Sequence, residues 1–235
     1  MTPKILKVQD PIKCENIISE AASVIREGGL VVYPTDTSYG LACDPRLESA
    51  LEKLMAAKGR DKSIGVPLLF NDLNQCEAYH EFGNLERVIA RIFWPGALTL
   101  VVTANEMVPR YITAGRDSIA IRVPNHIIPR GIAKAIEAPI VGTSANQSGG
   151  ESPFNVEVAL SQLADKVDLY IDGGPSTSSR NSTIIGVEES EANEGALNIK
   201  VYREGAVSIE SLTENLKIDS DALRFWTTRI VHPDK

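Results

Sequence analysis

The chain has 235 residues, and 43% of them are hydrophobic, which is enough for a sizeable core and too much for a disordered protein. Its 24 basic and 31 acidic residues give a net charge of −7, which disfavours a broad nucleic-acid surface because counterion release needs many cations. Three cysteines without a Cys-x-x-Cys pair and three histidines without metal-ligand spacing favour neither a disulfide framework nor a metal cage.

The N-terminal residues are not followed by an uninterrupted apolar stretch, and no later run reaches membrane-spanning length. We therefore expect a soluble, cytoplasmic protein with no membrane partner.

Apolar residues at helical spacing predict a first helix over 13–27, which a pair of glycines ends. A buried strand is predicted over 30–33, and the polar stretch 35–40 behind it is predicted to be a loop, the usual position of a ligand site in an α/β sheet.

Asp44 and Pro45 predict the N-cap and first turn of a second helix, with Lys58 and Arg60 at its C-terminal end. These cations could simply complement the helix dipole, an effect worth roughly 0.3–1 kcal/mol. Three cations within residues 58–62 exceed that need. We therefore favour anion binding, for which clustered Lys and Arg are suited.

The rest of the chain alternates strands with helices, which favours an α/β fold. Strands are predicted over 98–102, 118–124, 138–142, 169–172, 183–187 and 198–203, and helices over 85–93, 131–137 and 153–163, the last with Ser152 as its cap. Arg122 lies inside an apolar strand, where a charged residue has either a structural partner or an anionic ligand, and both options stay open.

The segment 143–149 crowds hydroxyls, amides and glycines directly behind the predicted strand 138–142. Such a segment can aim backbone N–H groups and short polar side chains at a ligand, and the cations at 58–62 supply the charge that it lacks. Together they predict a phosphate-handling site. Phosphate-loop, dinucleotide and Gly-x-Ser-x-Gly patterns are missing from the sequence, so the chemistry would use Lys, Arg, hydroxyls and amides to position and neutralise anions.

A set of short motifs follows in an order that resembles the YrdC-type family. The motifs are 34–41 (Pro-Thr-Asp-Thr-Ser-Tyr-Gly-Leu), 58–60 (Lys-Gly-Arg), 94–99 (Trp-Pro-Gly-Ala-Leu-Thr), 121–124 (Ile-Arg-Val-Pro), 143–146 (Thr-Ser-Ala-Asn), 182–185 (Ser-Thr-Ile-Ile) and 203–205 (Arg-Glu-Gly). The resemblance implies a single α/β catalytic domain over 12–210, with a twisted mixed β-sheet flanked by helices around a concave ligand cavity. Residues 211–235 are expected to be a tail or short helix, with no second domain.

The resemblance to the family's threonylcarbamoyl-AMP synthases implies a nucleotidyltransferase. It would condense L-threonine, bicarbonate or CO2, and ATP into threonylcarbamoyl-adenylate and pyrophosphate, and other proteins would transfer the product to tRNA. Magnesium is expected through the ATP phosphates, because the sequence offers no protein cage for it. Two alternatives stay open: a paralogue acting on another carbamoylated or acylated nucleotide, and an RNA-binding regulator, which the acidic charge disfavours. Any RNA contact is expected to be weak and local.

The same resemblance implies site residues. Those implied to be catalytic are Lys58, Arg60, Ser144 and Asn146. Threonine is implied to lie near Thr35, Arg122 and Ser182, with the guanidinium suited to a carboxylate. The nucleotide side is implied to contain Lys58, Lys62, Ser118, Ser144, Ser152 and Arg203.

Three further positions, Thr37, Tyr39 and Asn181, are weaker candidates whose role is expected to be the shaping of the loops. The sequence departs from the family's usual pattern after Arg60, where Asp61 replaces a common proline and a longer loop, 62–66, follows. Ligand contacts from that loop are therefore not carried over.

Overall fold

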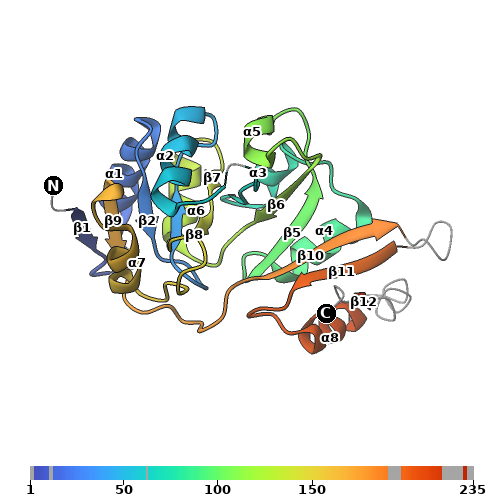
Figure 1. Cartoon of the computed structure of the whole chain (residues 1–235). Helices are drawn as coiled ribbons and strands as arrows, with labels where there is room; N and C mark the ends of the chain where they lie inside the picture. The colour runs from blue at the N-terminus through green and yellow to red at the C-terminus, as the bar shows by residue number, and fades with distance from the viewer. Residues whose placement is uncertain (1–2, 11–12, 62, 190–196, 219–229, 232–235) are drawn as a thin grey trace.

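The alternating apolar strands and amphipathic helices fold into two mixed β-sheets with helices packed around them (Figure 1). The computed structural model describes residues 3–10, 13–61, 63–189, 197–218 and 230–231. The helices are α1 Glu15–Arg26, α2 Glu48–Lys58, α3 Leu73–Glu77, α4 Asn84–Phe93, α5 Arg110–Thr113, α6 Ile127–Ala135, α7 Val156–Leu163 and α8 Ile209–Ile218, with a 3-10 turn at Ala164–Lys166. The strands are β1 Lys4–Lys7, β2 Val31–Tyr33, β3 Gly40–Ala42, β4 Leu68–Leu69, β5 Leu98–Thr103, β6 Ser118–Arg122, β7 Ile140–Val141, β8 Thr143–Ser144, β9 Leu169–Asp172, β10 Thr183–Glu189, β11 Leu197–Arg203 and β12 Ile230–Val231.

The two sheets have the strand orders β1-β9-β2-β3-β8 and β12-β11-β10-β5-β6-β4-β7. Both contain parallel and antiparallel pairs: β2 runs parallel to β9 and antiparallel to β3, and β4 runs parallel to β6 and antiparallel to β7. The predicted α/β class with mixed strand directions is confirmed. The strands divide between two sheets, however, where the sequence led us to expect one.

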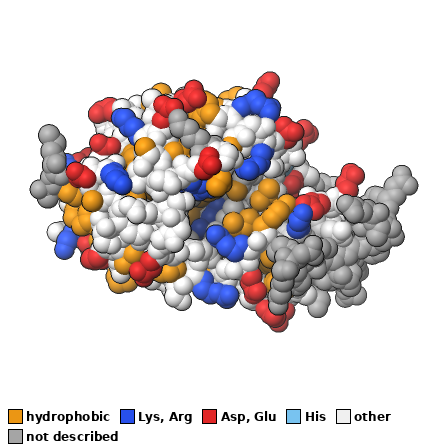
Figure 2. Space-filling model, viewed as in Figure 1, with side chains coloured by type: hydrophobic (Ala, Val, Ile, Leu, Met, Phe, Trp, Pro, Cys, Tyr) orange, Lys and Arg blue, Asp and Glu red, His pale blue; other side chains and the backbone are white. Residues whose placement is uncertain are grey.

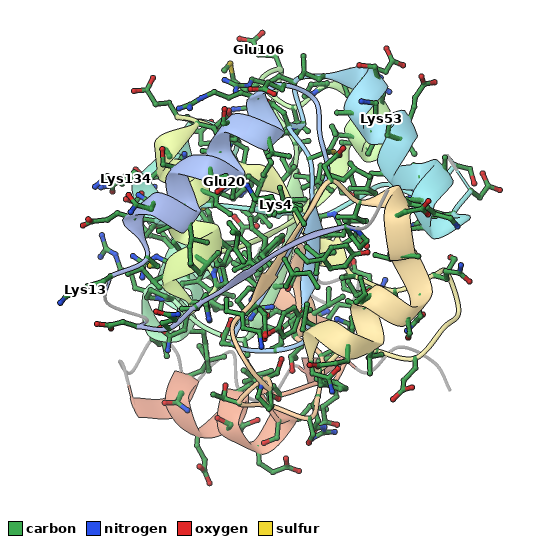
Figure 3. The ribbon with its side chains drawn as sticks, turned by 90° about the vertical axis from the view of Figure 1, so that its left-hand side faces the viewer. Lys4, Lys13, Glu20, Lys53, Glu106 and Lys134 are labelled. Atoms are coloured by element: carbon green, nitrogen blue, oxygen red, sulfur yellow. The ribbon has the colours of Figure 1, made fainter. Side chains whose placement is uncertain are left out.

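Two groups of buried apolar side chains hold these layers together. One of them joins Ala22 and Ile25 of α1 to Val31 of β2 and to Ile128 and Ile132 of α6. Burying a side chain the size of Ile contributes roughly 1.5–3 kcal/mol, so these contacts outweigh the surface ion pair between Lys4 and Glu20 that also links β1 to α1 (Figure 3). The larger group fills the space around β5, β6 and α4 and extends to α8.

Two helices begin later than predicted, and in neither of them is the predicted residue the N-cap. Helix α2 begins at Glu48 with Leu47 as its N-cap, and the Asp44 carboxylate instead accepts from the Arg46 N–H at 2.9 Å. Helix α7 begins at Val156, and its cap is Asn155, which accepts from the Val158 N–H at 2.8 Å, so Ser152 is not the cap.

Helix α6 begins four residues earlier than predicted, at Ile127, because the His126 side chain accepts from the Ile128 N–H and caps it. The predicted strand 138–142 ends early as β7, and the chain crosses at Gly142 into β8 of the other sheet. A Cβ at Gly142 would lie 2.2 Å from Leu69 Cγ, so the crossing leaves no room for a side chain. The polar segment 143–149 therefore starts as a strand.

Several short elements were not predicted, namely β1, β3, α3 and α5. Each has five residues or fewer, too short for a periodic pattern to emerge.

At the C-terminus, α8 packs Leu212 and Leu216 into the larger core. Residues 219–229 and 232–235 lie outside the described part, and the domain boundary at 210 stays a prediction. Of the helices in the described ranges, none is long and apolar enough to cross a membrane.

Candidate functional site

A cavity of about 380 Å³ lies between the two sheets. The first sheet contributes Tyr33 from β2, Gly40 from β3 and Thr143 from β8, and the second sheet contributes strands β4, β5, β6, β10 and β11. In the view of Figure 2, basic side chains gather around a hollow in the middle of the molecular surface. The cavity thus brings together segments that are distant in the sequence.

The charge of this cavity is strongly one-sided. Arg60, Arg116, Arg122 and Arg203 line it, whereas no Asp or Glu is among the described lining residues. Of these arginines, Arg122 is paired with a carboxylate outside the lining, that of Asp36, whose Oδ1 lies 2.6 Å from Arg122 Nη2. Hydroxyl groups of serine and threonine fill much of the remaining wall. An anion with polar substituents is therefore the ligand that this cavity suits, despite the negative net charge of the chain.

The end of α2 directs two cations toward the segment 143–149. Gly59 takes a left-handed conformation (φ 59°) that ends the helix and turns Arg60 into the cavity wall. The buried Lys58 ammonium donates to the backbone carbonyls of Ser144 and Asn146, the latter at 2.7 Å. In return, the Lys58 carbonyl accepts from the Ser148 N–H at 2.8 Å. Lys58 therefore holds the polar segment in place, and it does not line the cavity itself.

The electrostatics of Lys58 follow from this position. Burial, aided by the neighbouring Arg60 charge, lowers the pKa of Lys58 to about 8. Burial also lowers the pKa of Arg60, whose Nη1 donates to Thr143 Oγ1 at 3.3 Å and whose Nη2 donates to the Gly65 carbonyl at 3.1 Å. The cluster predicted from sequence at 58–60 and the segment 143–149 are thus in direct contact.

Ser144 and Asn146 have different positions, although the sequence pairs them. Ser144 lines the cavity, and its hydroxyl donates to Asn146 Oδ1 at 2.5 Å. The Asn146 amide lies behind it and donates to the Gly150 carbonyl at 2.9 Å. Asn146 is therefore a support for Ser144 in this structure and not a lining residue.

Of the residues predicted near threonine, Thr35 is linked to Arg122 through Thr37, whereas Ser182 contacts other residues. Its Nε donates to the Gly96 carbonyl at 2.8 Å, its Nη1 to Thr37 Oγ1 at 2.8 Å, and its Nη2 to Asp36. Thr35 and Thr37 bond to each other at 3.2 Å between their Oγ1 atoms, and both line the cavity. The structural partner of Arg122 that the sequence left open is Asp36, and the guanidinium still faces the cavity.

Ser182 directly precedes β10 of the second sheet and links two other residues, Thr99 and Arg203. Its hydroxyl accepts from Thr99 Oγ1 at 3.0 Å and from Arg203 Nη2 at 3.2 Å, and its carbonyl accepts from Arg203 Nε at 3.0 Å. Ser118 lies at the exposed edge of the cavity. Ser152 does not line it but accepts from Asn181 Nδ2 at 3.0 Å, and Asn181 does line it.

The remaining predicted residues are a buried tyrosine and an undescribed lysine. The Tyr39 hydroxyl donates to the Gly174 carbonyl at 2.5 Å and accepts from the Gly173 N–H at 3.0 Å, so it fastens the loop after β9 beside the cavity. Lys62 lies outside the described residues.

Sequence reasoning missed Tyr33, Thr99, Arg116 and Thr143 as lining residues. Thr99 and Thr143 stood within motifs that were recognised, but only the pairing of the strands shows that they face the cavity. Arg116 lies at the exposed rim, where its Nη2 donates to the Ser63 carbonyl at 3.3 Å. A single cation in a polar stretch carries no sequence signal.

Among the described residues, no group of three or more His, Cys, Asp or Glu side chains could hold a metal ion.

Known proteins share this architecture. The family model Sua5_yciO_yrdC, described as telomere recombination, matches residues 23–205. The threonylcarbamoyl-AMP synthase of Pyrococcus abyssi is 37% identical over 186 residues, and the putative threonylcarbamoyl-AMP synthase of Mycobacterium tuberculosis is 34% identical over 215 residues. These alignments cover 79% and 91% of this chain.

The relatives differ in length. The chain spans 54% of the P. abyssi synthase and 95% of the mycobacterial protein. The crystal structure of P. abyssi Sua5 complexed with L-threonine superposes with a TM-score of 0.82 at 32% identity, covering 92% of this chain and 61% of that one. Because the family model covers most of the chain and the identities exceed 30% over most of its length, the chain belongs to the Sua5/YciO/YrdC family.

Proposed function

We propose that the chain is a threonylcarbamoyl-AMP synthase, a nucleotidyltransferase that makes threonylcarbamoyl-adenylate for tRNA modification. The observation that carries the proposal is the cavity between the sheets, where four arginines and a set of hydroxyls meet with no acidic lining residue among those described. Two carboxyl-bearing or phosphorylated substrates need such a surface. Relatives of this chain carry the same activity in their names, and a relative's structure holds L-threonine.

In the proposed reaction, the threonine amine adds to CO2 and loses a proton, or attacks bicarbonate with loss of water, and either route forms a carbamate. A carbamate oxygen then attacks the α-phosphorus of ATP, and the bond to the bridging oxygen breaks to release pyrophosphate. Threonine would lie at the Arg122 end, since that guanidinium still has N–H groups for a carboxylate and is held rigid by Asp36 and Thr37. This arrangement would place the reacting amine inside the cavity and away from bulk water.

The phosphates would lie at the Arg60 end. Arg60 can neutralise charge on the phosphate oxygens, and the Ser144 hydroxyl can orient the nucleotide by a short hydrogen bond. Lys58 acts one step behind, by holding the Ser144 and Asn146 carbonyls. Arg203, Ser118 and the undescribed Lys62 complete the proposed nucleotide side.

Magnesium would enter with ATP, bound mainly through phosphate oxygens, and would supply charge dispersal on the leaving pyrophosphate. This fits the donor set of the cavity, whose described lining offers hydroxyls but no carboxylate cluster. Bicarbonate as the third substrate and tRNA-transfer proteins as downstream partners belong to the same proposal.

The test is pyrophosphate release by the full chain with ATP, L-threonine and bicarbonate, and with each omitted in turn. We expect release to require all three, with the adenylate product detected by its mass. Arg60→Ala should reduce turnover by about 100-fold or more, because it removes a cation from the phosphate side. Arg91→Ala, which removes an exposed arginine on α4, is the matched control.

The outcomes separate the alternatives. Pyrophosphate release that ignores threonine would favour a paralogue acting on another carbamoylated or acylated nucleotide. Salt-sensitive RNA binding without ATP turnover would favour an RNA-binding regulator. Either result would overturn the synthase assignment.

A further inference from the structure

Three buried side-chain atoms in the described part of the chain have no hydrogen-bond partner: Tyr33 Oη, Ser176 Oγ and Asn181 Oδ1. Folded proteins leave few such atoms, because each loses its hydration without a compensating bond. Two of the three, on Tyr33 and Asn181, belong to residues that line the cavity. Polar atoms without partners are therefore concentrated where a ligand would supply them.

Tyr33 is the sharper case, because its surroundings place the hydroxyl beside Gly40, a residue of the cavity wall. Tyr33 in β2 pairs with Gly40 in β3, and its side chain is fully buried. A Cβ at Gly40 would lie 2.4 Å from Tyr33 Cζ and 2.5 Å from Tyr33 Oη. The end of the phenol ring thus lies across Gly40, which also lines the cavity. Glycine at position 40 makes this placement possible.

Other buried tyrosines in the described part of the chain show that the fold can satisfy a phenol. The Tyr39 hydroxyl donates to the Gly174 carbonyl, and the Tyr170 hydroxyl donates to the Ala164 carbonyl at 2.7 Å. A phenylalanine at position 33 would fill the same space without an unpaired atom. The hydroxyl of Tyr33 therefore needs an explanation other than packing.

The environment makes this hydroxyl a donor to an anion. Burial raises the pKa of Tyr33 far above its ordinary value, although the nearby Arg122 charge opposes the rise, so the phenol stays protonated. Arg122 already uses three of its five N–H groups on Gly96, Thr37 and Asp36. A carboxylate has about four acceptor sites, more than the remaining N–H groups can fill.

We propose that Tyr33 is a substrate-binding residue, whose hydroxyl donates to the carboxylate that Arg122 holds on the amino-acid substrate. This rests on the proposed function, and it adds a donor on the first sheet to the arginine on the second. Both sheets then grip the same carboxylate, so the amino acid is bound only when the sheets keep their spacing.

The experiment compares Tyr33→Phe with Tyr170→Phe in the full chain. L-threonine is titrated calorimetrically, thermal unfolding is followed without ligand, and KM and kcat are measured for threonine. Tyr33→Phe should raise the Kd and KM for threonine at least fivefold, leave kcat at saturation within twofold, and unfold at the same or a higher temperature. Tyr170→Phe loses a satisfied hydrogen bond remote from the cavity, so it should unfold at a lower temperature and bind threonine normally.

Two results would overturn the assignment of Tyr33. If the threonine Kd of Tyr33→Phe were within twofold of the wild-type value, the hydroxyl would be an unpaired group of the core that does not contact the substrate. A lower unfolding temperature of Tyr33→Phe would show that the free protein satisfies the hydroxyl internally. A wild-type protein that binds no threonine would be a different failure, because it would overturn the proposed function itself.

Discussion

Lys58 shows how one residue can hold a charge in a site without lining it. Its ammonium is buried under the segment 143–149 and donates to two backbone carbonyls. A neutral amine keeps two N–H donors, which is enough for the same two carbonyls. The contacts can therefore survive deprotonation, whereas the positive charge behind the phosphate side cannot.

The lowered pKa of Lys58 predicts a pH-dependent stability. Between its folded pKa of about 8 and the ordinary value of 10.5, the unfolded chain carries a proton that the folded chain has lost. The unfolded state binds more protons, so the contribution of Lys58 to stability rises with pH in this range. The unfolding free energy of the wild type relative to Lys58→Met should therefore rise by up to about 1.4 kcal/mol per pH unit between pH 8 and 10.

Chemical denaturation at several pH values measures this difference. Lys134→Met, which removes an exposed lysine of α6, is the control for the loss of a surface charge (Figure 3). A difference between wild type and Lys58→Met that falls as the pH rises would contradict the argument.

At the scale of the elements, the ends of helices and strands position the site. Gly59 ends α2 so that Arg60 turns inward, and Gly142 carries the chain from one sheet to the other. Just before α7, two polar side chains three residues apart, Ser152 and Asn155, make different contacts. Asn155 caps the helix, whereas Ser152 accepts from the cavity residue Asn181.

This division predicts different effects of two alanine substitutions on stability. Asn155→Ala should lower the unfolding free energy by about 1 kcal/mol, because the Val158 N–H loses its capping acceptor. Ser152→Ala should cost less, since the Ser152 hydroxyl bonds Asn181 outside the helix, and should instead weaken ATP binding. Urea unfolding and ATP titration of both variants measure these effects. A larger loss of stability in Ser152→Ala would restore Ser152 as the cap.

At the scale of the whole molecule, the cavity exists only because two sheets face each other. Arginines from β6, from β11, from the turn after α2 and from the rim reach it from different parts of the chain, and the excess of acidic residues lies elsewhere on the surface. A net charge of −7 therefore does not describe the local potential. The strands that carry the site residues are also core strands, so ligand binding should stabilise the whole fold.

Pyrophosphate should therefore raise the unfolding temperature. At about 100 times its Kd, a ligand that binds only the folded state adds about 2.7 kcal/mol of stability. We expect most of this gain to be lost in Arg60→Ala and kept in Arg91→Ala, as measured by thermal unfolding at fixed ionic strength. Equal stabilisation of both variants would place the anion outside the cavity.

The class of the fold and the clusters of the site could be predicted from the sequence, because they depend on local patterns. Apolar periodicity marks α1, α4, β5 and β9, and dense runs of cations or hydroxyls mark 58–60 and 143–146. The motif order indicated the family that the comparisons show. The caps were predicted wrongly because Ser152 and Asn155 are both good capping residues, and only backbone geometry selects one.

The tertiary structure decided which of these residues face a ligand. Strand pairing over long sequence separations divides the strands between two sheets and turns Tyr33, Thr99 and Thr143 toward the same cavity. It also places Lys58 and Asn146 behind the wall and gives Arg122 its partner Asp36. A sequence carries the chemical types of its side chains and their local period. Which side chains meet across a cavity depends on packing between distant segments, and that packing leaves no local pattern.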